Sequence, residues 1–376
     1  MSIKPILVIL ILLMPVSLTN AQENVELSPR VGHKMVYDTE NDRVILFGGY
    51  TVDGTREFYN DTWVFSPHDN TWTELLINGP SHRGAHSMAY NPDQGTILLF
   101  GGQTSTRRLS DTWVFDCSTE TWTEIETDNA PEGRGDFDMV YDPKNQVFII
   151  YGGWGDRTGL QHDTWTFNPE TSAWTEIETD SDPGRMYGQS LEYDHTRERV
   201  ILYGGHLRSP ISHDHVDEAW FFHLENSSWA LSSSMDKPHG RYWSAVSYSD
   251  VYSSLVVFGG SYGIGPMNET WILNTEDMRW TQLNSPDYPT RRVISDIVYV
   301  ETQGSFILFG GGNNSPATFD DTWRLDPETW EWSRIQTSYS SREAVERREP
   351  GFIPGFSLLS IVIGTSVLIL RRKNLG

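Results

Sequence analysis

Five arginines recur at nearly constant intervals in the sequence, and their side chains could bind anions. They are Arg30, Arg83, Arg134, Arg241 and Arg292; a sixth, Arg185, is displaced by one residue from the same pattern. A guanidinium group donates hydrogen bonds in a planar fork that fits a carboxylate or a phosphate. If the five side chains converge, they would form a pocket for acidic peptides or sugar carboxylates. The alternative is that each arginine pairs with an acidic residue of a neighbouring repeat, which would leave no donor free.

A second group of candidate side chains is rich in histidine. His206, His213 and His215 lie close to Asp214 and Asp217 in the chain. Imidazole and carboxylate groups are common ligands of zinc and other transition metals. The three histidines are therefore weak candidates for metal ligands, and a solvated polar loop is the favoured interpretation. We expect no metal and no other cofactor.

Composition and charge limit the classes of function. The chain has 376 residues, of which 38% are apolar and 12% aromatic, so it can bury a large core. Asp and Glu number 51 against 28 Lys and Arg, which gives a net charge of −23. This balance argues against nucleic-acid binding, because few cations are present to neutralise phosphates. The single cysteine, Cys117, excludes an internal disulfide.

The residues that must position these side chains form an internal repeat. Glycine pairs occur at 48–49, 101–102, 152–153, 204–205, 259–260 and 310–311. A tyrosine stands eleven residues before each pair: Tyr37, Tyr90, Tyr141, Tyr193, Tyr248 and Tyr299. Two tryptophans nine residues apart follow each pair, beginning with Trp63 and Trp72, so that twelve of the fifteen tryptophans are repeat positions. Six copies with constant internal spacing indicate a repeat architecture.

Each copy is predicted to form four short strands. In the first copy these cover roughly residues 32–37, 44–47, 62–65 and 71–75, with turn residues between them. The second strand is continuously apolar, as in Val44–Phe47, so it must be buried on both faces. Four-stranded sheets that stack face to face around an axis bury every such strand. The prediction is an all-β fold.

The spacing Tyr-x10-Gly-Gly, followed by Asp-Thr-Trp and then Trp-Thr-Glu, resembles the kelch repeat over residues 30–337. The resemblance implies a six-bladed β-propeller of four-stranded antiparallel blades within residues 22–337. The expected blades cover about 30–78, 83–128, 134–180, 185–233, 241–285 and 291–337. We also expect each blade to close on its own four strands, so that blades 1 and 6 meet by side-chain packing alone.

In the kelch family, the loops after the glycine pairs and those between blades lie on one face, which carries most binding. The resemblance therefore implies that this face recognises a ligand, with Tyr50, Gln103, Trp154 and His206 as candidates beside the five arginines. The expected function is a non-catalytic module that binds a protein or a glycan. The alternative is a surface carbohydrate-active enzyme, because some kelch propellers are oxidases or epimerases. Cys117 lies in a predicted rim turn, so it does not fit the crosslinked cysteine of the copper oxidases. No catalytic residue is assigned.

The two ends of the chain carry targeting signals. Lys4, a short apolar run and small residues up to Ala21 predict a signal peptide over residues 1–21. Residues 352–370 are uncharged and precede Arg371-Arg372-Lys373, which predicts a single-pass transmembrane helix, with 371–376 as a cytoplasmic tail. Residues 338–351 are expected to form a stalk. The prediction is a cell-membrane protein with an extracellular propeller.

Two further sequence motifs are consistent with an exported location. Pro350-Gly351-Phe352 and Pro354-Gly355-Phe356 before the apolar run resemble the PGF-type sorting tails of archaeal surface proteins, which implies that the span could be exchanged for a lipid. Asn60, Asn226, Asn268 and Asn313 each begin an Asn-x-Ser/Thr sequence, so they are candidate glycosylation sites.

Overall fold

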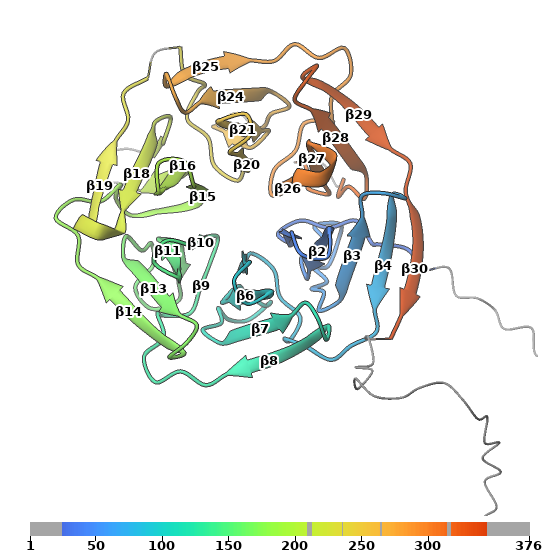
Figure 1. Cartoon of the computed structure of the whole chain (residues 1–376), viewed down its shortest axis with the longest axis horizontal. Helices are drawn as coiled ribbons and strands as arrows, with labels where there is room; N and C mark the ends of the chain where they lie inside the picture. The colour runs from blue at the N-terminus through green and yellow to red at the C-terminus, as the bar shows by residue number, and fades with distance from the viewer. Residues whose placement is uncertain (1–24, 209–212, 235, 264, 314–316, 344–376) are drawn as a thin grey trace, which may run out of the picture. The chain divides into compact units, whose positions relative to one another are not determined.

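The protein forms an all-β propeller of six blades in a computed structural model (Figure 1). The structure describes residues 25–208, 213–234, 236–263, 265–313 and 317–343. Each of six sheets contains four antiparallel strands in chain order, and two of these sheets have a fifth strand in addition. The prediction of six four-stranded blades is therefore confirmed.

The strands follow one another along the chain, from the innermost to the outermost of each blade. Blade 1 contains β1 (Lys34–Asp38), β2 (Arg43–Phe47), β3 (Thr62–Ser66) and β4 (Thr71–Leu75); blade 2 contains β5 (Ser87–Asn91), β6 (Thr96–Phe100), β7 (Thr112–Asp116) and β8 (Thr121–Ile125). Blade 3 contains β10 (Asp138–Asp142), β11 (Val147–Tyr151), β13 (Thr164–Asn168) and β14 (Ala173–Ile177); blade 4 contains β15 (Met186–Asp194), β16 (Arg199–Arg208), β18 (Ala219–His223) and β19 (Ser228–Leu231). Blade 5 contains β20 (Ala245–Ser249), β21 (Ser254–Phe258), β24 (Thr270–Asn274) and β25 (Arg279–Gln282); blade 6 contains β26 (Asp296–Val300), β27 (Ser305–Phe309), β28 (Thr322–Asp326) and β29 (Glu331–Ile335).

Short elements decorate this frame. β9 (Arg134–Gly135) pairs with β12 (Trp154–Gly155), β22 (Ser261–Tyr262) pairs with β23 (Gly265–Pro266), and β17 (His213–His215) pairs with the end of β16. The helical elements in the described part are two 3-10 turns, η1 (Leu224–Asn226) and η2 (Glu301–Gln303).

The second strand of each blade is buried because blades pack on both of its faces. In β2, Leu46 belongs to the core between blades 1 and 6, whereas its neighbour Ile45 belongs to the core between blades 1 and 2. Successive side chains of a strand point to opposite faces, so a continuously apolar strand serves two interfaces at once. The apolar pattern of these strands therefore reflects the stacking of the blades.

Tryptophans of the repeat connect neighbouring blades. The second tryptophan of a blade donates its indole N–H to the threonine that begins the third strand of the preceding blade. Such bonds join Trp72 to Thr322, Trp122 to Thr62, Trp174 to Thr112, Trp229 to Thr164 and Trp332 to Thr270, at 2.9–3.1 Å. In blade 4 this threonine is replaced by Ala219, and Trp280 bonds to Ser234 instead, at 3.2 Å. The indoles thus hydrogen-bond neighbouring blades to each other as well as filling the space between them.

The glycine pairs are required where a blade meets the next one near the axis. A Cβ on Gly48 would lie 2.7 Å from the carbonyl oxygen of Arg83, and the N–H of Gly49 donates to that same oxygen at 2.8 Å. Gly48 also has a φ of +64°, which side-chain-bearing residues rarely adopt. The pair therefore lets the backbone of the following blade approach closely.

A closed ring of backbone hydrogen bonds surrounds the axis; we call it the amide ring. It is formed by the residues that stand two positions after the repeat arginine, or after Met186 in blade 4: Gly32, Ala85, Asp136, Gly188, Trp243 and Ile294. Each donates its N–H to the carbonyl oxygen of the ring residue in the preceding blade, at 2.7–3.1 Å. All six have φ between 54° and 69°, although only two are glycines. The inner ends of the blades are thus joined in one continuous circle.

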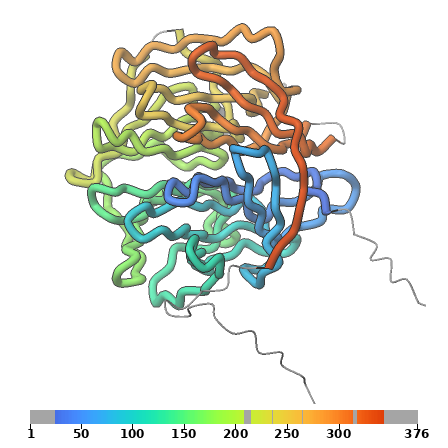
Figure 2. Tube along the Cα trace, turned by 45° about the vertical axis from the view of Figure 1, so that its right-hand side comes forward, coloured from blue at the N-terminus to red at the C-terminus, as the bar shows by residue number. Residues whose placement is uncertain are grey.

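The closure of the propeller differs from the expectation of side-chain packing alone. Ser338–Arg342, which we expected to begin a stalk, form β30, a fifth strand that runs parallel to β4 on the outer edge of blade 1 (Figure 1). The red C-terminal strand crosses from blade 6 to the blue blade 1 in Figure 2. Thr71 and Thr73 of β4 bond to the hydroxyl groups of Ser338 and Ser340. Blades 1 and 6 are therefore joined by backbone pairing as well as by packing.

The segment that precedes β1 also contributes to this seam. Leu27 is buried in the core shared by blades 1 and 6, whereas residues 25–29 form no strand. The predicted signal peptide, the transmembrane segment 352–370 and the tail that resembles PGF sorting signals lie outside the described residues. Within the described residues, no helix has the length and apolar character needed to cross a membrane.

Candidate functional site

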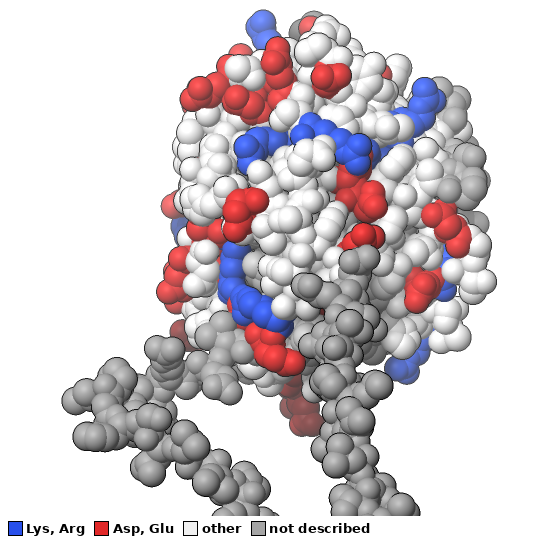
Figure 3. All heavy atoms as spheres, turned by 90° about the vertical axis from the view of Figure 1, so that its right-hand side faces the viewer, with Lys and Arg blue, Asp and Glu red and all other residues white. Residues whose placement is uncertain are grey.

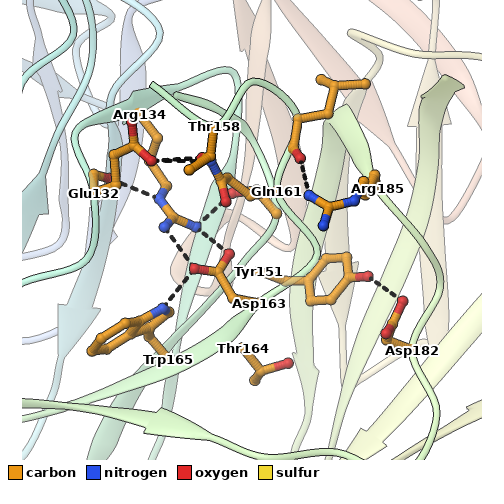
Figure 4. Close-up of polar contacts among 12 residues, drawn as sticks. Glu132, Arg134, Tyr151, Thr158, Gln161, Asp163, Thr164, Trp165, Asp182 and Arg185 are labelled. Atoms are coloured by element: carbon orange, nitrogen blue, oxygen red, sulfur yellow. Dashed lines mark hydrogen bonds and ion pairs between the residues drawn. The ribbon is translucent and has the colours of Figure 1, made fainter. Parts of the chain in front are cut away.

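The five repeat arginines are enclosed within their blades. Each has an exposed fraction of 0% and pairs with the carboxylate that precedes the third strand of its own blade. The pairs are Arg30–Asp61, Arg83–Asp111, Arg134–Asp163, Arg241–Glu269 and Arg292–Asp321, with N–O distances of 2.6–2.8 Å. Each guanidinium also donates to the carbonyl oxygen of the first glycine of the pair, as Arg134 does to Gly152 at 2.9 Å. The same carboxylate accepts the indole N–H of the first tryptophan, as Asp163 does from Trp165 (Figure 4).

This geometry contradicts the expectation that the five guanidinium groups line a ligand pocket. Their donors are used by the carboxylate, by the glycine carbonyl and by a carbonyl two residues earlier in the chain, such as that of Ser28 for Arg30. Burial opposes ionisation of Asp61, but the Arg30 guanidinium outweighs it and lowers the pKa of that carboxyl. The partner is an acidic residue of the same blade rather than of a neighbouring one. The arginine series is therefore part of the fold.

The upper face, which carries the loops after the glycine pairs and the loops between blades, bears a cluster of aromatic rings over blades 3 to 5. We call it the aromatic patch; its members are Trp154, Tyr187, His206, His215, Tyr242, Trp243 and Tyr262. Tyr187 lies at its centre, with ring centroids 5.3–5.8 Å from those of Trp154, His206, Tyr242 and Trp243. The patch continues through His215 to Tyr262, whose exposed fraction is 39%. All seven residues remain partly accessible.

The rings of the patch are held on rigid backbone. Tyr187 and His206 are opposite each other in the ladder of β15 and β16, and Tyr242 forms a bridge with Ser261. Trp243 belongs to the amide ring and donates its indole N–H to Asp136 of blade 3 at 3.0 Å. A surface of aromatic rings on a fixed scaffold loses little conformational entropy when it binds a partner.

His206 and His215 form a pair within the patch. They are opposite each other in the ladder of β16 and β17, and their Nδ1 atoms are 2.9 Å apart. Gly263 donates its backbone N–H to Nε2 of His215 at 3.3 Å. The side chain of His213 lies outside the described part, and the described residues contain no group of three or more side chains that could hold a metal ion.

The other predicted site residues are distributed over the upper face. Trp154 and His206 come together through Tyr187, but Tyr50 is 4% exposed and packs against Phe58. Gln103 forms backbone bridges with Gly84 and Arg108 in blade 2, apart from the patch. Sequence reasoning missed Tyr187, Tyr242, Trp243 and Tyr262. One signal was present: Trp154 and Trp243 are two of the three tryptophans that lie outside the repeat positions.

Cys117 and the candidate glycosylation sites differ in how far they are buried in the fold. Cys117 is buried between blades 1 and 2, and burial raises the pKa of its thiol. Asn60 and Asn226 are exposed, whereas Asn268 is half-buried and Asn313 forms a backbone bond to Ala317 at 3.0 Å. In two of the glycosylation sequences the threonine is buried: Thr62 accepts the indole N–H of Trp122, and Thr270 accepts that of Trp332.

A cavity of about 380 Å³ opens on the lower face, at the ends of the innermost strands. Above it, the Lys34 ammonium lies 3.0 Å from Asp138 and 3.7 Å from Asp296. These carboxylates also accept backbone N–H groups of the next blade's innermost strand: Asp138 accepts from Leu191, and Asp296 accepts from Met35. Burial raises the pKa of Asp296 to about 6, although Lys34 acts in the opposite direction. Asp138 and Asp296, neutralised in part by Lys34, therefore provide hydrogen-bond acceptors for backbone N–H groups of the innermost strands.

The comparisons with known proteins agree with the fold and the repeat. A family model described as the KLHDC2/KLHL20/DRC7 Kelch-repeats domain matches residues 16–187 and 179–351. These matches cover most of the chain, and together with the six blades they define a kelch-repeat β-propeller. The chain belongs to the kelch-repeat family.

Curated relatives share only part of their length with this chain. Acyl-CoA-binding domain-containing protein 5 of Arabidopsis thaliana is 29% identical over 187 residues, which cover 48% of this chain and 28% of that protein. Mei4-dependent protein 6 of Schizosaccharomyces pombe is 21% identical over 342 residues, which cover 80% of this chain and 48% of that protein. The chain thus spans half or less of the length of these relatives.

Proposed function

We propose that this chain is a binding module, held at the cell surface, that recognises a protein partner through the aromatic patch. The observation that carries the proposal is the continuous contact of rings from Trp154 to Tyr262 on one face of a rigid disc. Tyrosine and tryptophan are enriched at the centres of protein interfaces, where they supply most of the binding energy. Kelch propellers commonly bind proteins, which supports the same assignment.

The proposed location rests on the sequence. The predicted signal peptide would export the propeller, and residues 352–370 would hold it at the membrane, either as a span or through a lipid that replaces it. After expression in intact cells, the chain should remain in the membrane fraction through an alkaline wash and should be digested by external protease. A chain without residues 352–370 should appear in the medium. Recovery of the full chain from the cytosolic fraction would contradict this part of the proposal.

Site-specific crosslinking tests the binding surface. A photoreactive amino acid at position 242, within the patch, should give a crosslinked protein partner of defined mass on cells that express the full chain. The same group at position 251, in the β20–β21 turn on the lower face and 73% exposed, should give none.

A matched pair of tyrosine variants provides the second arm. Tyr262→Ala removes an exposed ring of the patch and should abolish the crosslink at position 242. Tyr288→Ala removes a ring that is 50% exposed outside the patch and should leave the crosslink unchanged. Equal crosslinking at positions 242 and 251 would contradict the proposal. Binding of glycans by the patch with no protein crosslink would replace the protein partner by a glycan.

A further inference from the structure

Blade 4 departs from the arginine pattern, and its arginine is exposed instead of paired with a carboxylate inside the blade. At the position of the repeat arginine, blade 4 has Met186, which is buried and whose carbonyl oxygen accepts the N–H of Gly153 at 2.9 Å. The carbonyl oxygen of Arg134 plays the same part for Gly102. Arg185 stands one residue earlier than the pattern requires, and its side chain is exposed.

The acidic partner in blade 4 has changed as well. Glu218 occupies the place that Asp163 holds in blade 3, and it pairs with Lys237 instead of an arginine. Arg185 therefore has no counterpart of the Arg134–Asp163 pair. Arg134 donates to the carbonyl oxygens of Glu132 and Gly152 and to the carboxylate of Asp163, whereas Figure 4 shows a single contact for Arg185.

Arg185 lines an open cleft of about 410 Å³ on the upper face, together with Trp154, Thr158, Gly159 and Leu160. The only hydrogen bond that its guanidinium makes within the described residues runs from Nη1 to the carbonyl oxygen of Leu160, at 2.8 Å. A guanidinium group has five N–H donors, so four remain for a ligand. Trp154 also lines the cleft, and its ring contact with Tyr187 connects the cleft to the aromatic patch.

The acidic groups around the cleft are already engaged. Asp182 accepts the N–H of Gly184 at 2.7 Å and lies 3.0 Å from His162. Glu132 accepts the backbone N–H of Arg157 and the hydroxyl of Thr158, at 2.7 and 2.6 Å. Asp156 pairs with Arg108. Among the described residues, none of these carboxylates forms an ion pair with Arg185, so its positive charge is the unmatched one in the cleft.

We propose that Arg185 and Trp154 form a subsite for a glutamate or aspartate side chain of the protein partner. The inference rests on the proposed function and names the chemistry that the patch selects. The planar fork of the guanidinium fits one carboxylate with two parallel hydrogen bonds, and the indole packs against the methylene groups that carry it. A single guanidinium suits a singly charged carboxylate better than a doubly charged phosphate.

The overall negative charge of the chain does not prevent this recognition. At physiological ionic strength, charges separated by more than about 8 Å are largely screened, so the cleft is governed by the groups that line it. The exposed position of the subsite predicts that binding weakens as salt is added.

The test uses an immobilised peptide library in which each glutamate-containing peptide has a twin with glutamine at the same position. The full chain, purified in detergent, should bind the best glutamate peptides about tenfold or more tightly than their glutamine twins, because a charged hydrogen bond contributes roughly 1.5–3 kcal/mol. Arg185→Ala should bind both twins equally. Arg185→Lys should retain only part of the preference, since lysine lacks the fork. The control Arg107→Ala removes another exposed arginine of the upper face and should keep the full preference.

The outcomes separate this inference from the proposed function. If Arg185→Ala retains the preference for glutamate, the subsite assignment is wrong. If the library shows no preference for glutamate while Tyr262→Ala still abolishes peptide binding, the patch binds protein but the acidic subsite is wrong. If no peptide binds and glucuronate-bearing glycans do, both proposals fail. The circular dichroism spectrum of each variant should match that of the wild type, because Arg185 makes one hydrogen bond.

Discussion

At the scale of single residues, one amino-acid type has two roles in this propeller, and burial distinguishes them. The five regular arginines each satisfy a carboxylate and a glycine carbonyl of their own blade, in every blade except blade 4. The displaced Arg185 is exposed because Met186 takes the enclosed position. The regular spacing of the arginines indicates the buried role, and the one-residue displacement of Arg185 is the sequence feature that indicates the exposed role.

Replacing a regular arginine should cost stability. Arg134→Ala leaves the carboxylate of Asp163 without its partner in a site where both side chains are largely enclosed. Removing one member of a buried ion pair typically costs about 3–5 kcal/mol. Chemical denaturation should show a loss of this order for Arg134→Ala and a change of less than about 0.5 kcal/mol for the exposed Arg185→Ala. Equal stabilities for the two variants would show that the buried pairs contribute little.

Asp296 should make stability depend on pH. Its pKa in the folded protein is raised to about 6, whereas an unfolded aspartate ionises near about 3.9. As pH rises between these values, the unfolded state loses its proton first, so the folded state is progressively disfavoured. Relative to Asp296→Asn, the wild type should therefore lose on the order of 2–3 kcal/mol between pH 4 and pH 7. Parallel stability curves for the two proteins over this range would contradict the assignment.

At the scale of elements, β30 is the feature that the sequence did not indicate. The segment Ser338–Arg342 has no apolar alternation, and its polar side chains are typical of a linker. It forms a strand because the free edge of β4 offers backbone partners and because Arg342 pairs with Glu120 in the turn of blade 2. The pairing joins a segment that follows the sixth copy to the first blade, so no single repeat contains it.

Removing β30 should weaken the seam between blades 1 and 6. A chain that ends at residue 337 lacks the five pairs with β4 and the bond from Arg342 to Glu120. Compared with a chain that ends at residue 343, its melting temperature should fall by roughly 5 °C or more, since about 1 kcal/mol shifts a large domain by about 2–4 °C. Hydrogen exchange should accelerate in β4 and stay unchanged in β14 of blade 3. Uniform acceleration in all blades would contradict a local role.

At the scale of the whole molecule, the fold could be predicted because its signals recur six times. The glycine pairs, the tyrosines and the paired tryptophans are dictated by contacts that recur from blade to blade, such as the bond from Trp122 to Thr62, the residue that begins β3. The aromatic patch, in contrast, consists of residues that the six copies do not share. Tyr187 and Tyr242 stand between repeat positions, and nothing in a single sequence says that β15 and the strand ends of blade 5 bring their rings together.

Net charge should make stability and ligand binding respond to salt in opposite directions. The chain carries a charge of −23, and Figure 3 shows acidic groups distributed among basic ones over the rim. Salt screens this self-repulsion, so raising NaCl from 10 to 300 mM should increase the melting temperature. Over the same range, the preference for glutamate peptides should fall. A binding preference that rises with salt would indicate apolar contacts instead of the guanidinium at Arg185.

The amide ring also fixes how many repeats the chain can use. Its six members share nearly the same backbone conformation, with φ between 54° and 69°, so each blade turns the chain through the same one-sixth of a full rotation. A duplication or loss of one copy would leave the circle with the wrong number of equal steps. Such a chain would have to change the conformation of every ring residue at once or remain an open arc. The geometry of the amide ring therefore favours six copies. Repeated sequences are prone to recombination between copies, and this geometry would disfavour the chains of five or seven copies that result.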